Sequence, residues 1–323
     1  MKRFFSILLL SAVATTLVAQ SNMQLNNFWE NTFFINPASI NEKYNGELAF
    51  AGRQLWAGNE GAASTAFGSA SLYNEDMRSQ FGFKAIGDHI GYTTRFDGLL
   101  TYAYSIFISR DVHLHMGLGG GYQFLTYDLS QARVADPNDI TPYYRLSQRS
   151  NFNSDFGMEL YTKNLRIGLS GQHLVSTISL VDSLLGNSTF YAYVHYKENL
   201  KRYINMSYGV CFIDNNGQYT DMSGLRNRDI YQLHLTSSAY FKVTPTAPVF
   251  NMGLYTRLPI NYAGRSFIPE IGGLFGIEIG YNTYLTYSFD FNISNINRNS
   301  IGTHELMITY KINARRKCRT CLL

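Results

Sequence analysis

Long hydrophobic runs are scarce in this chain of 323 residues. After the first 19 residues, no stretch approaches the ~18 apolar residues that a membrane-spanning helix needs, and the mean hydropathy of −0.15 is too low for a helical membrane protein. Neither sign of charge is in large excess, because the formal net charge is only +4. No basic run is interleaved with aromatic residues in the manner of a single-strand-binding protein, so no nucleic-acid partner is expected.

Aromatic residues, in contrast, are abundant. The chain has 24 Tyr and 22 Phe, and aromatics make up 15% of all residues. This content is high for a soluble enzyme, but it fits a β-barrel whose wall carries a girdle of aromatic side chains at each membrane interface.

Two segments near the C-terminus alternate between apolar and polar residues over lengths that suit a membrane-crossing strand. These segments are 284–293 and 305–312. Period two indicates strands, because successive side chains leave a strand on opposite faces. A strand that crosses a bilayer needs about 9–11 residues, whereas a globular strand usually has about 5–6. The segments therefore predict a transmembrane β-barrel with lipid outside and a polar lumen inside.

The rest of the mature chain divides in the same way, so we predict an all-β fold: an outer-membrane β-barrel of about 14 antiparallel strands. From residue 98 onward, short and long links alternate strictly, as expected when periplasmic turns are short and outer loops are long. An even strand number places both ends of the barrel chain in the periplasm. The expected strands are 46–56, 62–73, 79–90, 98–109, 112–127, 152–162, 165–175, 189–197, 202–213, 229–243, 248–258, 269–280, 283–293 and 302–312.

Period two also assigns each side chain to lipid or to the lumen. On the strand at 98–109, we expect Leu100, Tyr102, Tyr104, Ile106 and Ile108 to face lipid. The lumen set carries charges of both signs, which is typical of a closed or plugged barrel and not of a wide pore. The polar residues expected in the lumen include His113, His115, Glu159, Arg166, Gln172, His195, His234, Arg257, Glu278, Asp290, Glu305 and Lys311.

The N-terminus looks like a targeting segment. Lys2 and Arg3 precede an apolar stretch, and Leu17-Val18-Ala19 is an acceptable cleavage signal with Gln20 as the mature start. An exported barrel points to a bacterial outer membrane. We therefore expect a signal peptide over 1–19, a periplasmic or plug-like segment over 20–45, the barrel over 46–313 and a basic periplasmic tail over 314–323.

Four motifs of the mature chain resemble those of one family of membrane proteins. They are Ile35-Asn36-Pro37-Ala38, Arg53-Gln54-Leu55-Trp56-Ala57-Gly58, Gly87-Asp88-His89-Ile90-Gly91 and Gly302-Thr303-His304-Glu305-Leu306-Met307. With this order, the chain resembles the PorP/SprF family, outer-membrane components of the type IX secretion system of Bacteroidetes. It departs from the family at Glu60-Gly61-Ala62-Ala63, where many members have Gly-Ala-Pro.

The resemblance implies a non-catalytic function. Family members resemble accessory barrels that work with periplasmic ring proteins, or with a secreted surface protein, such as an adhesin, that carries a type IX C-terminal domain. Besides these proteins, the expected partner of the barrel wall is outer-membrane lipid. The second hypothesis, which needs only the architecture, is a passive channel for small or hydrophobic solutes. A TonB-dependent receptor is disfavoured, because the chain has no room for a separate plug domain.

The segment that we single out contains Asn36, Pro37, Arg53, Gln54 and Trp56. We expect it to shape the barrel mouth or a plug that a partner recognises. The simpler role for Trp56 is an aromatic anchor at the outer interface, and the simpler role for Arg53 is to bridge lumen carboxylates. For the crowded glycines from 117 to 121, the expected role is curvature of the barrel wall.

Other candidates for chemistry are weaker. His113 and His115 share one strand face, but two ligands do not make a zinc site, so we expect polar lumen groups and neither a metal nor a cofactor. No G-x-S-x-G elbow occurs, so no enzymatic activity is expected. Cys318 and Cys321 form a C-x-x-C in the basic tail. This tail is either a frayed end, oxidised within itself, or a tether that docks on a periplasmic partner.

Overall fold

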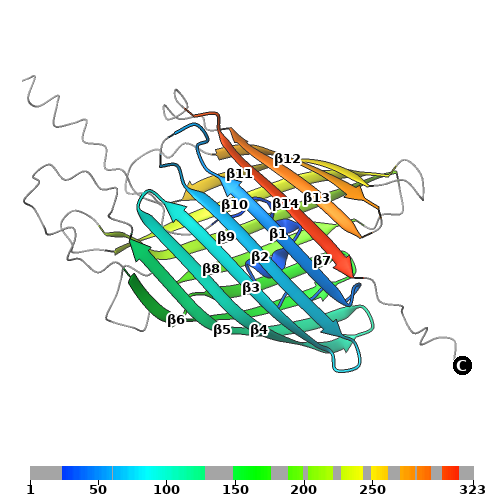
Figure 1. Cartoon of the computed structure of the whole chain (residues 1–323). Helices are drawn as coiled ribbons and strands as arrows, with labels where there is room; N and C mark the ends of the chain where they lie inside the picture. The colour runs from blue at the N-terminus through cyan, green and yellow to red at the C-terminus, as the bar shows by residue number, and fades with distance from the viewer. Residues whose placement is uncertain are drawn as a thin grey trace, which may run out of the picture.

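Fourteen strands form one closed antiparallel barrel in the computed structural model, which describes residues 24–59, 61–127, 148–175, 188–198, 203–220, 227–242, 249–260, 270–280, 282–291 and 300–312 (Figure 1). The barrel closes where β1 pairs with β14, from Gly46 opposite Ile312 to Gln54 opposite His304. The predicted fold class is therefore confirmed. The strands are β1 (Gly46–Gln54), β2 (Ser64–Asn74), β3 (Ser79–Ile90), β4 (Thr93–Ser109), β5 (Val112–Tyr127), β6 (Gln148–Thr162), β7 (Leu165–Gln172), β8 (Thr189–Lys197), β9 (Ile204–Thr220), β10 (Asn227–Phe241), β11 (Phe250–Ile260), β12 (Glu270–Ile279), β13 (Thr283–Phe291) and β14 (Thr303–Ile312).

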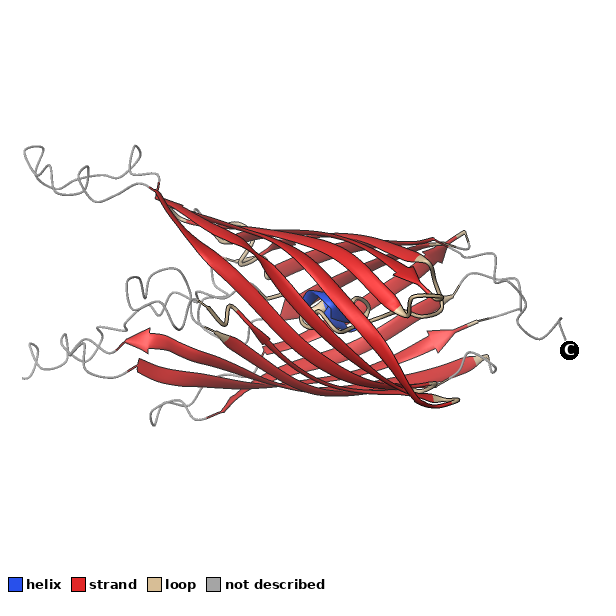
Figure 2. Ribbon diagram, turned by 90° about the horizontal axis from the view of Figure 1, so that it is seen from below, coloured by secondary structure: helices blue, strands red, loops and turns tan. Residues whose placement is uncertain are grey.

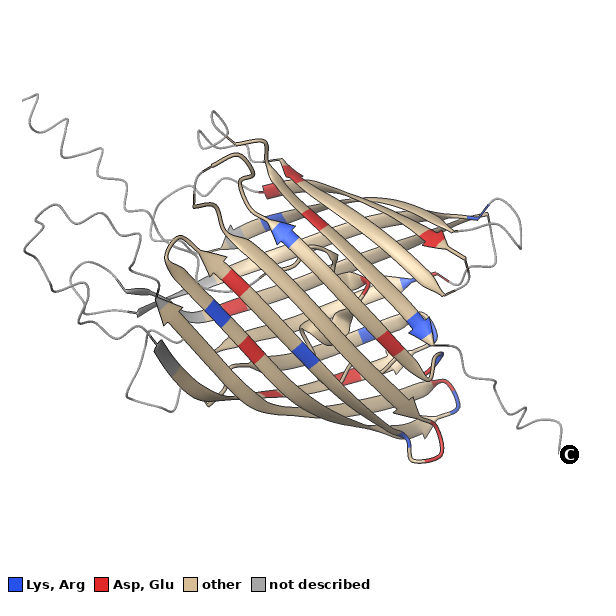
Figure 3. Ribbon diagram, in the orientation of Figure 1, with Lys and Arg blue, Asp and Glu red and all other residues tan. Residues whose placement is uncertain are grey.

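The wall is apolar outside and mainly polar inside. On β4, Leu100 and Ile108 are 70% and 61% exposed, whereas Ser105 on the other face is fully buried. The outward residues expected on this strand are all exposed, so their assignment is confirmed. Both charge signs lie on neighbouring strands along the barrel (Figure 3).

The two ends of the barrel differ. The chain enters β1 and leaves β14 at the same end, which we call the turn end, and the opposite end is the loop end. The turn end also holds the tight links at 75–78, 110–111, 163–164 and 280–282.

Two links at the loop end differ from expectation. β4 begins at Thr93 and not at 98, so only Gly91 and Tyr92 separate it from β3. β9 and β10 leave only 221–226 between them, fewer residues than 242–249 at the turn end. The strict alternation of link lengths is therefore wrong at this hairpin. The strands are longer than expected because alternating apolar residues mark only the part of a strand that lies in lipid. Antiparallel backbone pairing can continue beyond it into water.

Residues 24–45 lie inside the barrel, and we call them the plug (Figure 2). The plug contains two short 3-10 helices, η1 (Asn27–Trp29) and η2 (Thr32–Phe34). No helix among the described residues is long and apolar enough to span a membrane. Apolar plug residues pack against inward-facing apolar residues of the wall. The lumen therefore contains a hydrophobic core and is not purely polar, in contrast to the polar lumen that the sequence pattern predicts. The cluster contains Leu25, Phe28, Trp29, Phe34, Ile35, Ala49, Ala51, Phe67, Ile86, Tyr191, Tyr193, Cys211, Ile213 and Met307.

The orientation of β4 gives a first prediction. Leu100→Arg should lower the free energy of unfolding by ~2–4 kcal/mol, because the charge would lie deep in lipid. Ile108→Arg is a matched control on the same face, beside the turn at 110–111, and should cost about 0–1 kcal/mol. Equilibrium urea unfolding in lipid vesicles measures both values. Equal costs would contradict the depth that the barrel gives to Leu100.

Candidate functional site

The first residues of the plug bind to the last strands of the barrel. The Glu305 carboxylate accepts hydrogen bonds from the backbone N–H groups of Asn26 and Asn27, at 2.7 and 2.9 Å. The Asn26 side chain donates to Asp290 at 2.9 Å and to the Tyr255 hydroxyl at 2.7 Å. Residues of β11, β13 and β14 thus hold the beginning of the plug.

Arg53 joins the same network. Its Nη2 lies 3.1 Å from Asp290 Oδ2 and its Nε lies 4.0 Å from Glu305 Oε2, while Nη1 donates to the backbone carbonyl of Gln24. Arg257 lies 3.8 Å from the same Asp290 oxygen. All four charged side chains are almost completely buried. Since a buried carboxylate without a partner is strongly destabilising, these cations allow the acids that bind the plug to remain inside the lumen. We call Arg53, Asp290 and Glu305 the anchor.

The Asn-Pro segment contacts the opposite wall. Asn36 is fully buried, and its Nδ2 donates to the Tyr193 hydroxyl at 3.0 Å and to the Met158 carbonyl at 3.1 Å. Its Oδ1 accepts the Ala38 N–H at 2.9 Å, which is the side-chain-to-backbone bond of an Asx-turn around Pro37. One side chain therefore both shapes the turn and ties it to β6 and β8.

Two glycines of the wall make room for this turn. A Cβ at Gly117 would lie 2.5 Å from Ala38 N and 2.6 Å from Pro37 O, and a Cβ at Gly157 would lie 1.9 Å from Asn36 Oδ1. At Gly117, close approach of the plug backbone is therefore a more specific reason for glycine than the expected curvature.

Aromatic side chains fill much of the remaining space. Trp29 Nε1 donates to His234 Nδ1 at 3.2 Å, and the Trp29 ring lies 4.9 Å from that of His195. Phe34 packs edge-on against Phe67 with ring centroids 5.0 Å apart. Sequence reasoning missed these contacts. The signal that would have revealed them is the placement of Phe28, Trp29, Phe33 and Phe34 within a segment otherwise rich in Asn.

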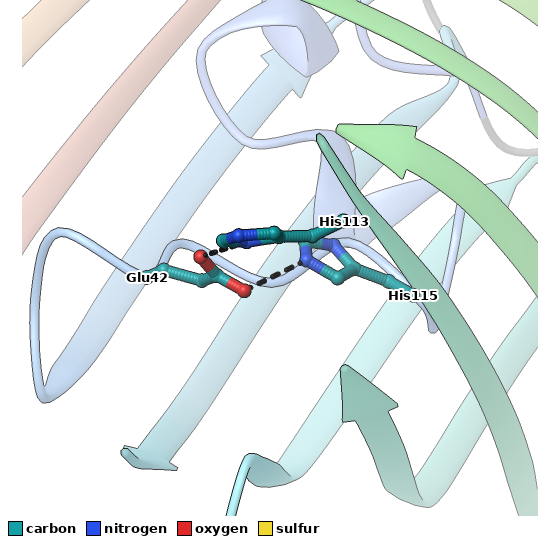
Figure 4. A group of neighbouring side chains, drawn as sticks. All are labelled: Glu42, His113 and His115. Carbon is teal, nitrogen blue, oxygen red and sulfur yellow. Dashed lines mark hydrogen bonds and ion pairs between the residues drawn. The ribbon is translucent and has the colours of Figure 1, made fainter. Parts of the chain in front are cut away.

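The last part of the plug carries Glu42, which faces β5 (Figure 4). Its carboxylate lies 2.7 Å from His113 Nδ1 and 3.1 Å from His115 Nε2, and it accepts the Ser105 hydroxyl at 2.7 Å. Burial raises the pKa of Glu42, but the hydrogen bonds from His115 and Ser105 outweigh it and lower the pKa to about 2. Glu42 is therefore ionised at neutral pH.

A cavity of about 310 Å³ opens at the turn end between the plug and the wall. Burial raises the pKa of Glu30 in its lining, but the Lys197 charge 3.7 Å away and the Tyr240 hydroxyl lower it overall. Positive charge predominates in the lining, which contains Lys43, Lys163, Arg166, Lys197 and Lys311 against Glu30, Glu47 and Glu198. We call this space the basic cavity.

Between the described residues deeper in the lumen, the cavities are smaller. Two cavities between plug and wall measure about 10 Å³ each, which is room for about one water molecule. One is lined by Asn27, Trp29 and Thr286 among others, and the other by Phe28, Phe34 and Tyr191 among others.

The residues singled out from the sequence do not form one site. Asn36 and Pro37 lie in the plug and Arg53 in the anchor, but Gln54 faces outward and its amide contacts the Ala63 carbonyl at 3.3 Å. Trp56 follows β1 at a φ of +44°, and its backbone N–H donates to Thr303 Oγ1 at 3.3 Å. Gln54 and Trp56 thus lie at the loop end, where they contact residues 63 and 303 and not the plug. Cys318 and Cys321 lie outside the described residues.

The fit of the plug gives a second prediction. Gly117→Ala should lower the free energy of unfolding by ~1–3 kcal/mol, because the added methyl group would overlap the plug backbone. Gly120→Ala is the matched control on the same strand, since its Cβ would meet only Phe152, at 3.6 Å, and should cost less than about 0.5 kcal/mol. Urea unfolding and protease protection of the N-terminal segment measure the effect. Equal stabilities would contradict the close approach.

Comparison with solved structures identifies the architecture. The chain matches the CymD monoaromatic hydrocarbon channel with a TM-score of 0.52 and 12% identity, covering 87% of this chain and 92% of that one. A FadL homologue from Pseudomonas aeruginosa (13% identity, TM-score 0.49, 86% and 93% covered) and the toluene transporter TbuX from Ralstonia pickettii (12%, 0.48, 87% and 93%) are also similar. The first likeness supports the fold alone.

Comparison of the sequence identifies the family. None of the curated proteins is similar enough to count as a relative. Residues 17–310, however, match the family described as "Type IX secretion system membrane protein PorP/SprF", which supports a non-enzymatic role and places the barrel in the bacterial outer membrane. The match covers nearly the whole chain and confirms the resemblance noted in its motifs: the chain belongs to the PorP/SprF family of type IX secretion system membrane proteins.

Proposed function

We propose that this barrel assists the secretion or surface attachment of a cargo protein through protein–protein contacts and does not conduct solutes. The observation that carries the proposal is the plug inside the lumen. The plug belongs to the same chain, and the buried anchor ties its beginning. Inward of the basic cavity at the turn end, two further cavities beside the plug measure only about 10 Å³ each.

A periplasmic ring protein of the secretion system is the first proposed partner, and the basic cavity is its proposed contact. Short turns face the periplasm in bacterial outer-membrane barrels, which puts the turn end on that side. The excess of Lys and Arg in the lining suits an acidic segment, because complementary charges steer association and select partners.

The second proposed partner is a secreted, adhesin-like surface protein with a type IX C-terminal domain. Family membership supports it. In this role the barrel is a scaffold whose closed lumen keeps the outer membrane sealed while the cargo is held or transferred.

The alternative function is a passive channel for small or hydrophobic solutes. The barrel fold shared with the CymD hydrocarbon channel favours it, although at 12% identity the likeness concerns the fold. A channel would require the plug to leave the lumen. The free-energy cost of breaking the buried anchor opposes this movement.

Conductance separates the two functions. The purified barrel in planar bilayers should carry no steady current. Arg53→Ala combined with Asn36→Ala removes ties at two points of the plug and should produce current, which also proves that the assay detects an open lumen. A steady current from the unaltered barrel would contradict the scaffold role and favour the channel.

Affinity purification from mild detergent tests the partners. The unaltered barrel should recover a type IX ring protein or a cargo protein, and Lys163→Glu in the basic cavity should lower the yield of the ring protein several-fold because it repels an acidic segment. Lys242→Glu, also at the turn end but outside the cavity lining, is the control. Recovery of neither class of protein would refute the proposal, and equal yields from the two variants would refute the cavity as the contact.

A further inference from the structure

Three side chains with metal-binding atoms meet where the end of the plug faces β5 (Figure 4). Glu42 precedes β1, while His113 and His115 are two residues apart on β5 and therefore share its inward face. Glu42 Oε2 lies 2.7 Å from His113 Nδ1, and Glu42 Oε1 lies 3.1 Å from His115 Nε2. The three candidate ligand atoms all lie within 4.8 Å of one another. The two histidines that are insufficient alone thus acquire a third ligand from a distant part of the chain.

The donor set suits a divalent transition metal. Two imidazole nitrogens and one carboxylate oxygen are the protein ligands of many zinc sites that leave a fourth position for water or another ligand. Ligand atoms around tetrahedral zinc lie roughly 3.2–3.6 Å apart. The two contacts between Glu42 and the histidines therefore need to open by about half an ångström, whereas atom pairs near the 4.8 Å limit need to approach. Glu42 lies outside the strands, so its adjustment does not break strand pairing.

Glu159 supplies the second, independent observation. Its Oε1 lies 3.6 Å from His115 Nδ1, and both side chains are fully buried. Neither of these atoms has a hydrogen-bond partner among the described residues. A histidine that binds metal through Nε2 carries its proton on Nδ1 and usually donates it to a carboxylate. Metal binding at His115 Nε2 fixes this tautomer and aims the proton at Glu159.

The surroundings of Glu42 complete the arrangement. The Ser105 hydroxyl donates to Glu42 Oε1 at 2.7 Å, and such a bond orients a ligating carboxylate. The side chains of His113 and Glu42 are 15% and 14% exposed, so an ion can reach the cluster, whereas the His115 side chain is fully buried.

We propose that Glu42, His113 and His115 bind one divalent transition-metal ion of the zinc type, with Glu159 as a positioning residue behind His115. The ion cross-links the end of the plug to the barrel wall at β5. The competing arrangement is metal-free: a protonated His115 that bridges Glu42 and Glu159.

Binding of Zn²⁺ to the full chain in detergent, after EDTA treatment, tests the site. All variants carry Cys318→Ser and Cys321→Ser, so that the C-x-x-C of the tail contributes no sites. One Zn²⁺ should bind per chain and should raise the urea midpoint. Binding should be lost in Glu42→Gln and His113→Ala, and unchanged in His89→Ala, a control at an exposed histidine outside the cluster. Glu159→Gln should weaken it about 10–100-fold while keeping the stoichiometry.

Co²⁺ provides a readout that a purely structural defect does not imitate. The Co²⁺-loaded chain should show visible d–d absorption of a four- or five-coordinate site, and His113→Ala should abolish it. His113 is partly exposed, so this variant keeps the test informative even where His115→Ala fails to fold. Absence of saturable Zn²⁺ binding, or binding that survives both Glu42→Gln and His113→Ala, would overturn the proposal in favour of the metal-free bridge.

Discussion

Backbone pairing between β1 and β14 is the constraint on which the rest of the structure depends. Lipid offers no hydrogen bonds, so every strand in the wall must pair on both sides, and the sheet is stable in a bilayer only when its ends meet. Closure makes one face of each strand contact lipid and the other the lumen. The alternation of Leu100, Ser105 and Ile108 between exposed and buried positions follows directly.

Fourteen strands create a second requirement. About eight strands enclose a space that wall side chains can fill, and the diameter grows with the strand number. Here the plug occupies much of the remaining space; its aromatic residues supply volume and its Asn residues supply hydrogen bonds. The wall is shaped to match the plug, because glycines, which have no side chain, occupy positions 117 and 157 where Asn36 and Pro37 approach. Inward-facing Phe67, Ile86 and Met307 meet the apolar face of the plug.

The sequence predicted what depends on local periodicity, and it failed where distant residues meet. Period two identified the strands and the inward direction of His115, Glu159, Asp290 and Glu305, because facing is a property of a strand alone. It does not report which residue lies across the lumen. Glu42 is separated from His115 by 73 residues along the chain, and no local pattern connects them. Arg53 and Gln54 belong to one motif, yet they point to opposite faces, since neighbours on a strand must diverge.

The ties at the two ends of the plug differ in their exposure to solvent. In the anchor, the side chains of Arg53, Asp290 and Glu305 are at most 4% exposed, so their charges interact with little screening by solvent. The side chains of Glu42 and His113 are 14% and 15% exposed, so water and salt reach this tie more readily than they reach the anchor. Without a bound ion, the end of the plug near the basic cavity is therefore the more sensitive of the two to salt. A metal ion at Glu42, His113 and His115 would add coordination bonds to this end of the plug and make it less sensitive to salt.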